Sequence, residues 1–113
     1  MTTTGAAEGQ HPERPAAELI EAVDLGAASR ALAGAVTRTP TIDCPELGEL
    51  TGSPVSLKAE CLQSTGSFKI RGAYNFLSLM SEADRKKGVV GWSSGNHAQG
   101  LAEAGRLLSL IHI

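Results

Sequence analysis

A short apolar run that leads through a small polar turn into a helix is the feature that most constrains the fold. Residues 88–92, Gly-Val-Val-Gly-Trp, carry no charge and are bounded by glycine, which predicts a buried strand. Residues 93–97, Ser-Ser-Gly-Asn-His, follow as a turn, and residues 98–107 have helical spacing. Such a strand-turn-helix unit belongs to α/β folds and directs free backbone N–H groups at a carboxylate or phosphate. An ordinary Ser or Asn cap at the start of a helix gives the same pattern.

A lysine at the start of a second predicted helix is the other informative feature. Residues 65–73 read Thr-Gly-Ser-Phe-Lys-Ile-Arg-Gly-Ala, and we expect a helix over residues 67–80 with Thr65 or Ser67 as its cap. Lys69 follows Phe68 directly, so the protein scaffold fixes where its amine lies. Partly apolar surroundings disfavour the charged form of an amine, and a neutral amine attacks aldehydes to form a Schiff base. The alternative is a solvent-exposed lysine beside a core aromatic side chain.

Taken together, the two segments resemble the fold-type II, or β-family, pyridoxal phosphate enzymes. Within that family they resemble threonine/serine dehydratases (ammonia-lyases) and serine racemases. The resemblance runs from Arg38 to Leu107 and is carried by residues 38–40, 57–60, 65–73 and 93–100. It implies an α/β fold, the N-terminal part of a tryptophan synthase β-like architecture in which helices flank an incomplete parallel sheet. It also implies pyridoxal 5′-phosphate as cofactor and conversion of L-threonine or L-serine to a 2-keto acid and ammonia.

The resemblance assigns roles to individual residues. Lys69 would bind the cofactor and act as the base at the substrate Cα, with Phe68 packed against the cofactor. Asn96 would donate a hydrogen bond to the phenolic oxygen of the cofactor ring. The group around the substrate carboxylate would be Ser93, Asn96 and His97. Alternatively, His97 is simply a polar residue in the first turn of a helix and has no role in binding.

Two further positions are informative within the family. At Ser94 many threonine dehydratases carry alanine, whereas in serine racemases the matching serine is the acid/base on the opposite face of the substrate. Ser94 therefore does not decide whether the substrate is threonine or serine, or whether the reaction is elimination or racemisation. We expect Arg71 to be structural, through a salt bridge or a contact on the phosphate side. A non-catalytic α/β module that binds an anion at residues 93–97 is the alternative from another class.

Composition narrows the possible partners. The 113 residues carry a net charge of −2 and no basic cluster, so we expect no binding to nucleic acid or membranes. There is no N-terminal apolar segment of the kind that directs secretion. Cys44 and Cys61 lack the spacing of a metal or disulfide motif, and we expect no metal site. These features predict a cytoplasmic protein. The family resemblance further implies a small amino acid as substrate and a homo-oligomeric parent enzyme.

Local signals divide the chain further. We expect helices over residues 25–36, capped by Asp24, and over residues 45–50, ended by Gly52, and another short helix capped by Ser81. Residues 54–60 alternate like a strand, which Lys58 and Glu60 would flank as solvent-exposed charges.

We expect three regions: a disordered tail over residues 1–17, the N-terminal portion of a catalytic domain over residues 18–107, and a foreign tail over residues 108–113. The tail Leu-Ser-Leu-Ile-His-Ile departs from the family pattern of a glycine followed by a buried strand. The codons CTG TCT CTT ATA CAC ATC would encode it, and they match a transposon end used in sequencing libraries. We therefore expect an N-terminal fragment, inactive alone because its phosphate-binding loop lies further on. A genuine β-prone C-terminus is the alternative.

Overall fold

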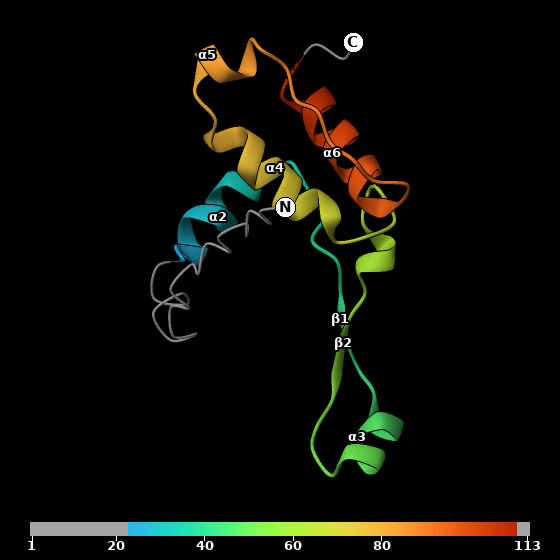
Figure 1. Cartoon of the computed structure of the whole chain (residues 1–113). Coiled ribbons are helices and arrows are strands. Elements are labelled where there is room, and N and C mark those ends of the chain that lie inside the picture. The colour runs from blue at the N-terminus through green and yellow to red at the C-terminus, as the bar shows by residue number, and fades with distance from the viewer. Residues whose placement is uncertain (1–22, 111–113) are drawn as a thin grey trace, which may run out of the picture.

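The computed structural model describes residues 23–110, which form two unequal parts (Figure 1). Three longer helices gather at one end, and a thin arm extends away from them. The elements in chain order are α2 (Leu25–Leu32), β1 (Thr41–Asp43), α3 (Pro45–Thr51), β2 (Ser56–Lys58), the 3-10 turn η1 (Glu60–Leu62), α4 (Lys69–Leu79), α5 (Glu82–Arg85) and α6 (Asn96–Leu107). The expected tail over residues 1–17 lies outside the described residues.

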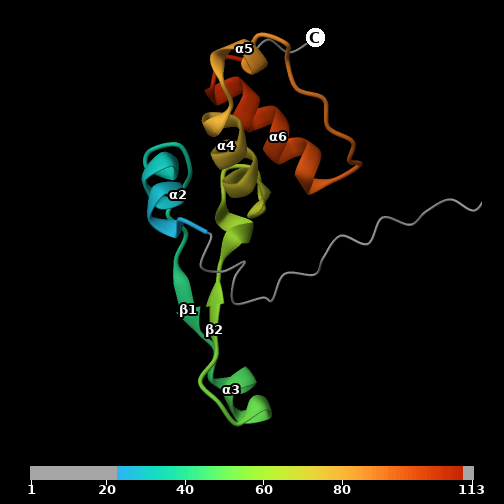
Figure 2. The same ribbon diagram turned by 60° about the vertical axis from the view of Figure 1, so that its left-hand side comes forward.

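Helices α4 and α6 lie side by side and run in the same direction, as Figures 1 and 2 show. Ala73 and Leu77 of α4 and Ala104 of α6 are buried together between the two helices. The small residues allow the helices to approach closely, and the larger apolar side chains that surround this cluster are only partly buried: Tyr74, Met80, Leu101, Leu108 and Leu110. The core of the described chain is therefore one narrow seam between two helices.

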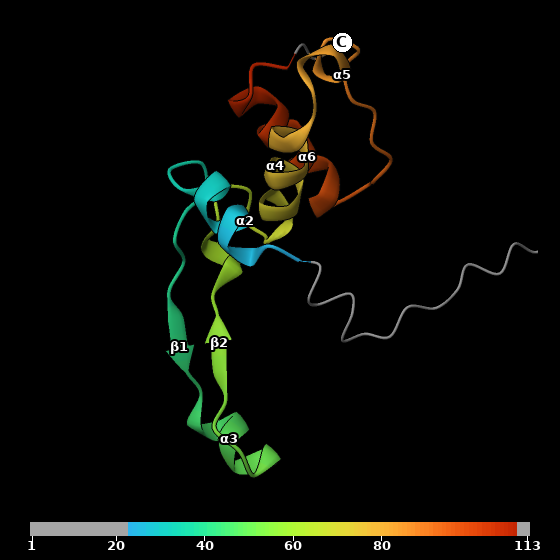
Figure 3. The same ribbon diagram turned by 90° about the vertical axis from the view of Figure 1, so that its left-hand side faces the viewer.

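The arm consists of β1, α3 and β2 (Figure 3). Strands β1 and β2 pair antiparallel, with Ile42 opposite Leu57. Helix α3 begins with Pro45, whose missing N–H costs nothing at that position, and ends at Gly52 in the left-handed conformation (φ 69°). The predicted end of this helix at Gly52 is confirmed.

A parallel sheet does not form among residues 23–110, where the two strands pair antiparallel. Residues 88–92, predicted to be a buried strand, run back along α6 from α5 without pairing to any strand that the structure describes. Val90 and Trp92 are fully exposed to solvent. The sequence correctly marks this segment as extended and apolar, but a strand also needs a neighbour to bond to its backbone, and none lies beside it within 23–110.

Segment 88–92 nevertheless touches the helices on one side. Beside this contact, a cavity of about 180 Å³ lies between the segment and helices α4 and α6. The residues that line it include Leu77, Val89, Gly91, Leu101 and Leu110. The lining is largely apolar and contains none of the side chains predicted to carry the chemistry. We therefore interpret this cavity as a gap in the packing between the segment and the helices, and not as part of the candidate site.

The helix caps agree with the sequence in two cases and differ in one. Asp24 accepts a hydrogen bond from Ala27 N at 2.7 Å, and Ser81 Oγ accepts one from Asp84 N at 3.1 Å, so both predicted caps are confirmed. Helix α2 ends at Leu32 instead of residue 36, because the chain turns at Gly34 (φ 78°). Helix α4 begins at Lys69 with no side-chain cap, so the prediction of Thr65 or Ser67 as cap is wrong.

Leu77 of α4 is fully buried, whereas the neighbouring Phe76 is largely exposed. No helix of the described residues is long and apolar enough to cross a membrane. Within the same range, no three His, Cys, Asp or Glu side chains gather closely enough to bind a metal ion.

Candidate active site

Lys69 is the first residue of α4, and its amine has few neighbours. Its Nζ lies 4.5 Å from the centre of the Phe68 ring. Among residues 23–110 it forms no hydrogen bond or ion pair. The ring of Phe68 is itself 57% exposed, so it leaves one side open to a bound group. An amine without an acidic partner can act as a nucleophile or base, as the sequence predicts for Lys69.

Helix α6 meets Lys69 at a glycine. A Cβ atom placed on Gly100 would lie 2.9 Å from the Lys69 carbonyl carbon, 2.9 Å from Ile70 N and 3.1 Å from Lys69 Cβ. Asn96 begins α6 four residues earlier, about 6 Å along the helix axis. The start of α6 is therefore about one helical turn from the point where α6 touches the lysine.

The turn before α6 leaves backbone donors free. Gly95 N donates to Ser93 Oγ at 3.2 Å, and the N–H groups of Ala98 and Gln99 are directed at Gly95 O. The N–H groups of Asn96 and His97 have no partner within the described part of the chain. Gly95 occupies the cap position without a side-chain bond, so the alternative of an ordinary Ser or Asn cap is wrong. Free N–H groups at the start of a twelve-residue helix favour an anion.

The predicted side chains of the turn are accessible. Ser94, Asn96 and His97 are exposed, and Ser93 is half-buried. Apart from Ser93, none of them takes part in a side-chain hydrogen bond within residues 23–110. The structure thus brings the turn 93–97 close to the start of α4 and leaves its polar atoms available.

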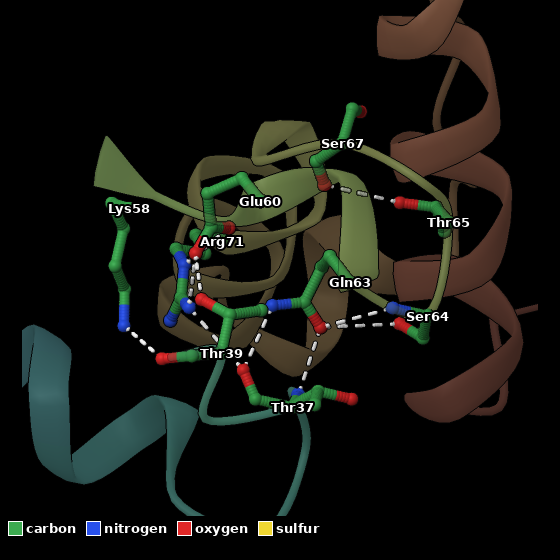
Figure 4. A network of polar contacts seen from close by, with 9 residues as sticks. All are labelled: Thr37, Thr39, Lys58, Glu60, Gln63, Ser64, Thr65, Ser67 and Arg71. Carbon is green, nitrogen blue, oxygen red and sulfur yellow. Dashed lines mark hydrogen bonds and ion pairs between the residues drawn. The ribbon is translucent and has the colours of Figure 1, made fainter. Parts of the chain in front are cut away.

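An ion pair anchors the first turn of α4 on the side away from α6 (Figure 4). Arg71 Nε donates to Glu60 Oε2 at 2.9 Å, and Arg71 Nη2 donates to Glu60 Oε1 at 2.7 Å. Thr39 Oγ1 adds a 2.6 Å bond to Glu60 Oε1. The hydrogen bonds from Arg71 are the main reason that the pKa of Glu60 falls to about 2, and Glu60 in turn raises the pKa of Arg71. The expected salt bridge of Arg71 is confirmed, whereas the solvent-exposed role expected for Glu60 is wrong.

Gln63 ties the segment before β1 to the same region. Its Oε1 accepts from Thr37 N at 2.8 Å, and its Nε2 donates to Thr37 O at 2.9 Å. Arg71 also donates to Thr37 O, and Lys58 Nζ donates to Thr39 O. Gln63 could not be found from the sequence, because its partner Thr37 lies 26 residues away and no local pattern marks such a pairing.

One buried hydroxyl near Lys69 has no partner. Ser67 is only 6% exposed, and its Oγ makes no hydrogen bond within the described residues. Figure 4 shows its side chain directed away from the Glu60–Arg71 network. Buried hydroxyls are nearly always hydrogen-bonded, so an unpaired one two residues before Lys69 suits a region that contacts a bound group.

With this geometry in view, the comparisons with known proteins identify the class. A family model described as "Pyridoxal-phosphate dependent enzyme" matches residues 10–112. The chain therefore belongs to the pyridoxal-phosphate dependent enzymes. Its solved relatives are fold-type II enzymes, as the resemblance in the sequence implied.

The individual relatives are named as ammonia-lyases and serine racemases. The chain is 53% identical over 87 residues to L-threo-3-hydroxyaspartate ammonia-lyase of a Pseudomonas species, which covers 77% of this chain and 27% of that protein. It is 48% identical over 92 residues to L-threonine ammonia-lyase of Thermotoga maritima, with 81% and 23% covered. The structure of maize serine racemase matches with a TM-score of 0.65 and 37% identity, over 79% of this chain and 29% of that one. The chain thus spans about a quarter of the length of these relatives.

The residues present fit one end of the cofactor. An unpaired lysine amine suits the aldehyde of pyridoxal phosphate, and the exposed amide of Asn96 suits a ring oxygen. The free N–H groups of Asn96 and His97 and the unpaired Ser67 hydroxyl are donors that a polar ligand requires. This donor set is chemically consistent with the family.

Proposed function

We propose that the protein containing this chain is a pyridoxal phosphate-dependent ammonia-lyase that converts a β-hydroxy amino acid to a 2-keto acid and ammonia. L-Threonine and L-serine are the proposed substrates. The observation that carries the proposal is that Lys69, whose amine is unpaired within residues 23–110, meets α6 at Gly100, about one helical turn from the open start of that helix. We further propose a cytoplasmic, homo-oligomeric enzyme.

The proposal gives each of these side chains a role. Lys69 holds the cofactor covalently through Nζ and later takes the proton from the substrate Cα. Asn96 donates to the ring oxygen, and Phe68 covers the cofactor beside the lysine. When bound, pyridoxal phosphate supplies an electron sink that stabilises negative charge at the substrate Cα.

The substrate carboxylate is assigned to the turn before α6. The N–H groups of Asn96 and His97 are free there, and the positive end of the helix dipole favours a negative group. Ser93 and His97 complete this subsite with their side chains. The exposed Ser94 hydroxyl is assigned to the face of the substrate opposite Lys69, where it can exchange a proton.

The covalent role of Lys69 is tested by borohydride reduction of the full-length protein loaded with pyridoxal phosphate. We expect a yellow protein that bleaches on reduction, and a pyridoxyl group on the peptide that contains Lys69. Lys69→Ala should abolish both this adduct and 2-keto acid release. Lys86→Ala is the matched control, because Lys86 forms only an exposed ion pair with Glu82. Activity of Lys69→Ala within tenfold of wild type would rule out the proposed role.

Two other activities have specific support. The relative that shares 53% identity acts on L-threo-3-hydroxyaspartate, as its name states, and serine racemases are among the solved relatives. One assay panel separates them: 2-keto acid release from L-threonine, L-serine and L-threo-3-hydroxyaspartate, and D-serine formation from L-serine. The substrate with the highest kcat/KM identifies the main activity.

A non-catalytic anion-binding protein is the remaining alternative. It requires the open turn 93–97 but no reactive amine. Absence of the adduct on Lys69, together with saturable phosphate or carboxylate binding that a negative charge introduced into the turn by Ser94→Asp abolishes, would favour it over the enzyme.

A further inference from the structure

Gly100 stands out because a glycine there is unnecessary for the backbone. It lies inside α6 in ordinary helical conformation, where alanine is normally the more stable residue. Gly100 is also buried, so no solvent-facing role accounts for it. The close approach of α4 explains the glycine, because a Cβ at this position would lie only 2.9 to 3.1 Å from atoms of α4.

The three nearest atoms that it would meet belong to Lys69 or to the peptide bond that follows it. They are the Lys69 carbonyl carbon, Ile70 N and Lys69 Cβ. Two of the three are backbone atoms, which cannot rotate away as the end of a flexible side chain can. A methyl group on Gly100 would therefore displace the root of the Lys69 side chain or push α6 away from α4.

This contact also links the two halves of the site. Lys69 is the first residue of α4, and the turn 93–97 leads into α6. Gly100, in the second turn of α6, contacts Lys69 directly. On the opposite side, the Glu60–Arg71 ion pair holds the first turn of α4. A shift forced at Gly100 would consequently change the position of the lysine amine relative to Asn96.

We propose that Gly100 is a positioning residue that sets the Lys69 amine against the Ser93–His97 turn, and that this is why α6 carries a glycine at that point. The inference rests on the proposed function, because it concerns how Lys69 meets pyridoxal phosphate. A displacement of about 1 Å can reduce a reaction rate about 10²-fold when two groups must be aligned.

The test compares Gly100→Ala with two packing controls in the full-length protein. Gly91→Ala introduces a methyl group that would overlap Leu101 Cδ2, the end of a side chain that can move, and Gly91 does not touch Lys69. Ala104→Gly loosens the same helix seam one turn further along α6. All variants are made with Gly72→Ala, which adds a methyl group in open space on α4 and should stabilise that helix.

Three readouts separate positioning from stability. Thermal unfolding of the cofactor-free protein reports packing, titration with pyridoxal phosphate reports apparent affinity, and mass spectrometry after borohydride reports the adduct on Lys69. For Gly100→Ala we expect about tenfold weaker cofactor affinity and less adduct at limiting cofactor, with kcat reduced at least tenfold and KM within about threefold. The two controls should lower the unfolding temperature without these losses.

Each other outcome counts against the inference. Wild-type affinity and adduct in Gly100→Ala would overturn it, and so would equal losses in the two controls. If Gly100→Ala fails to fold in the Gly72→Ala background while both controls fold, the role of Gly100 is in the packing of the helices and not in positioning Lys69. If the parent protein itself forms no adduct on Lys69, the proposed function fails and the inference falls with it, which is a result distinct from all of these.

Discussion

At the scale of single residues, the site depends on side chains that the rest of the chain leaves free. Lys69 Nζ and the polar atoms of Ser94, Asn96 and His97 make no side-chain hydrogen bonds within residues 23–110. Arg71 and Glu60, by contrast, are fully engaged with each other. Residues that are positioned by the backbone but unpaired at their ends are available for a ligand, whereas paired residues support the structure.

Ser94 allows the two proposed chemistries to be separated. Ser94→Ala should suppress racemisation by about 10²- to 10⁴-fold, because it removes the acid/base group from one face of the substrate. Dehydration should fall much less, since Lys69 still takes the α-proton on its own face. The measurements are D-serine formation and 2-keto acid release from the same preparations.

Ser29→Ala is the control for this prediction, because Ser29 is an exposed serine of α2, remote in sequence from the turn. Equal loss of both activities in Ser94→Ala, or no loss of either, would contradict the proposed role. A change confined to racemisation would support a serine that acts on the opposite face from Lys69.

At the scale of elements, the sequence predicts what local physics controls. Asp24, Ser81 and Gly52 act where expected, because a cap or a left-handed turn depends on a few neighbouring residues. The start of α4 was misplaced, since no cap bond from Thr65 or Ser67 forms. The Glu60–Arg71 pair and the Thr37–Gln63 bonds join segments that are 11 and 26 residues apart, and only the folded chain reveals them.

The Glu60–Arg71 pair predicts a dependence of stability on pH. The pKa of Glu60 is lowered from 4.5 to about 2, mainly by hydrogen bonds from Arg71. A folded-state pKa below the unfolded value means that the carboxylate stabilises the protein above about pH 4.5 and loses this contribution as the pH falls toward 2. The side chain of Glu60 is 16% exposed and that of Arg71 30%, so solvent screens the pair only in part.

Glu60→Gln should therefore lower the free energy of unfolding at pH 7 by about 1–3 kcal/mol. The difference from wild type should shrink as the pH falls from 5 toward 2, as measured by urea unfolding at several pH values. Glu82→Gln is the control, because Glu82 forms an exposed ion pair with Lys86 and should change stability little. A difference for Glu60→Gln that does not vary with pH would contradict an ionic role.

At the scale of the whole molecule, the described chain buries little of its apolar surface. Its radius of gyration is 19.2 Å, against about 13 Å for a compact domain of 100 residues. The arm carries exposed Ile42, Leu50 and Leu57, and segment 88–92 carries exposed Val90 and Trp92. The sequence predicts segment 88–92 to be buried, but a pattern within one segment does not show which other part of a protein covers it.

The sheet follows the same logic. The sequence predicts an α/β fold with a parallel sheet, from helical patterns that follow extended apolar segments and from the family resemblance. Parallel strands pair only with strands that are distant in the sequence, so each one requires a crossover and a neighbour. Segment 88–92 has no neighbouring strand within residues 23–110, and we propose that the longer protein supplies one.

Trp92 is the natural probe for this proposal, because it is the only tryptophan of the chain and is 99% exposed. In the 113-residue chain, its fluorescence should be quenched by acrylamide nearly as efficiently as that of a free tryptophan derivative. In the longer protein that contains it, pairing of residues 88–92 into a sheet should shield the indole, shift its emission to shorter wavelength and reduce quenching severalfold. The signal of Trp92 is obtained there by subtracting the emission of the Trp92→Phe variant, which removes any contribution from other tryptophans. Equal quenching in the two proteins would show that the segment stays exposed, and the proposed parallel sheet could not then include it.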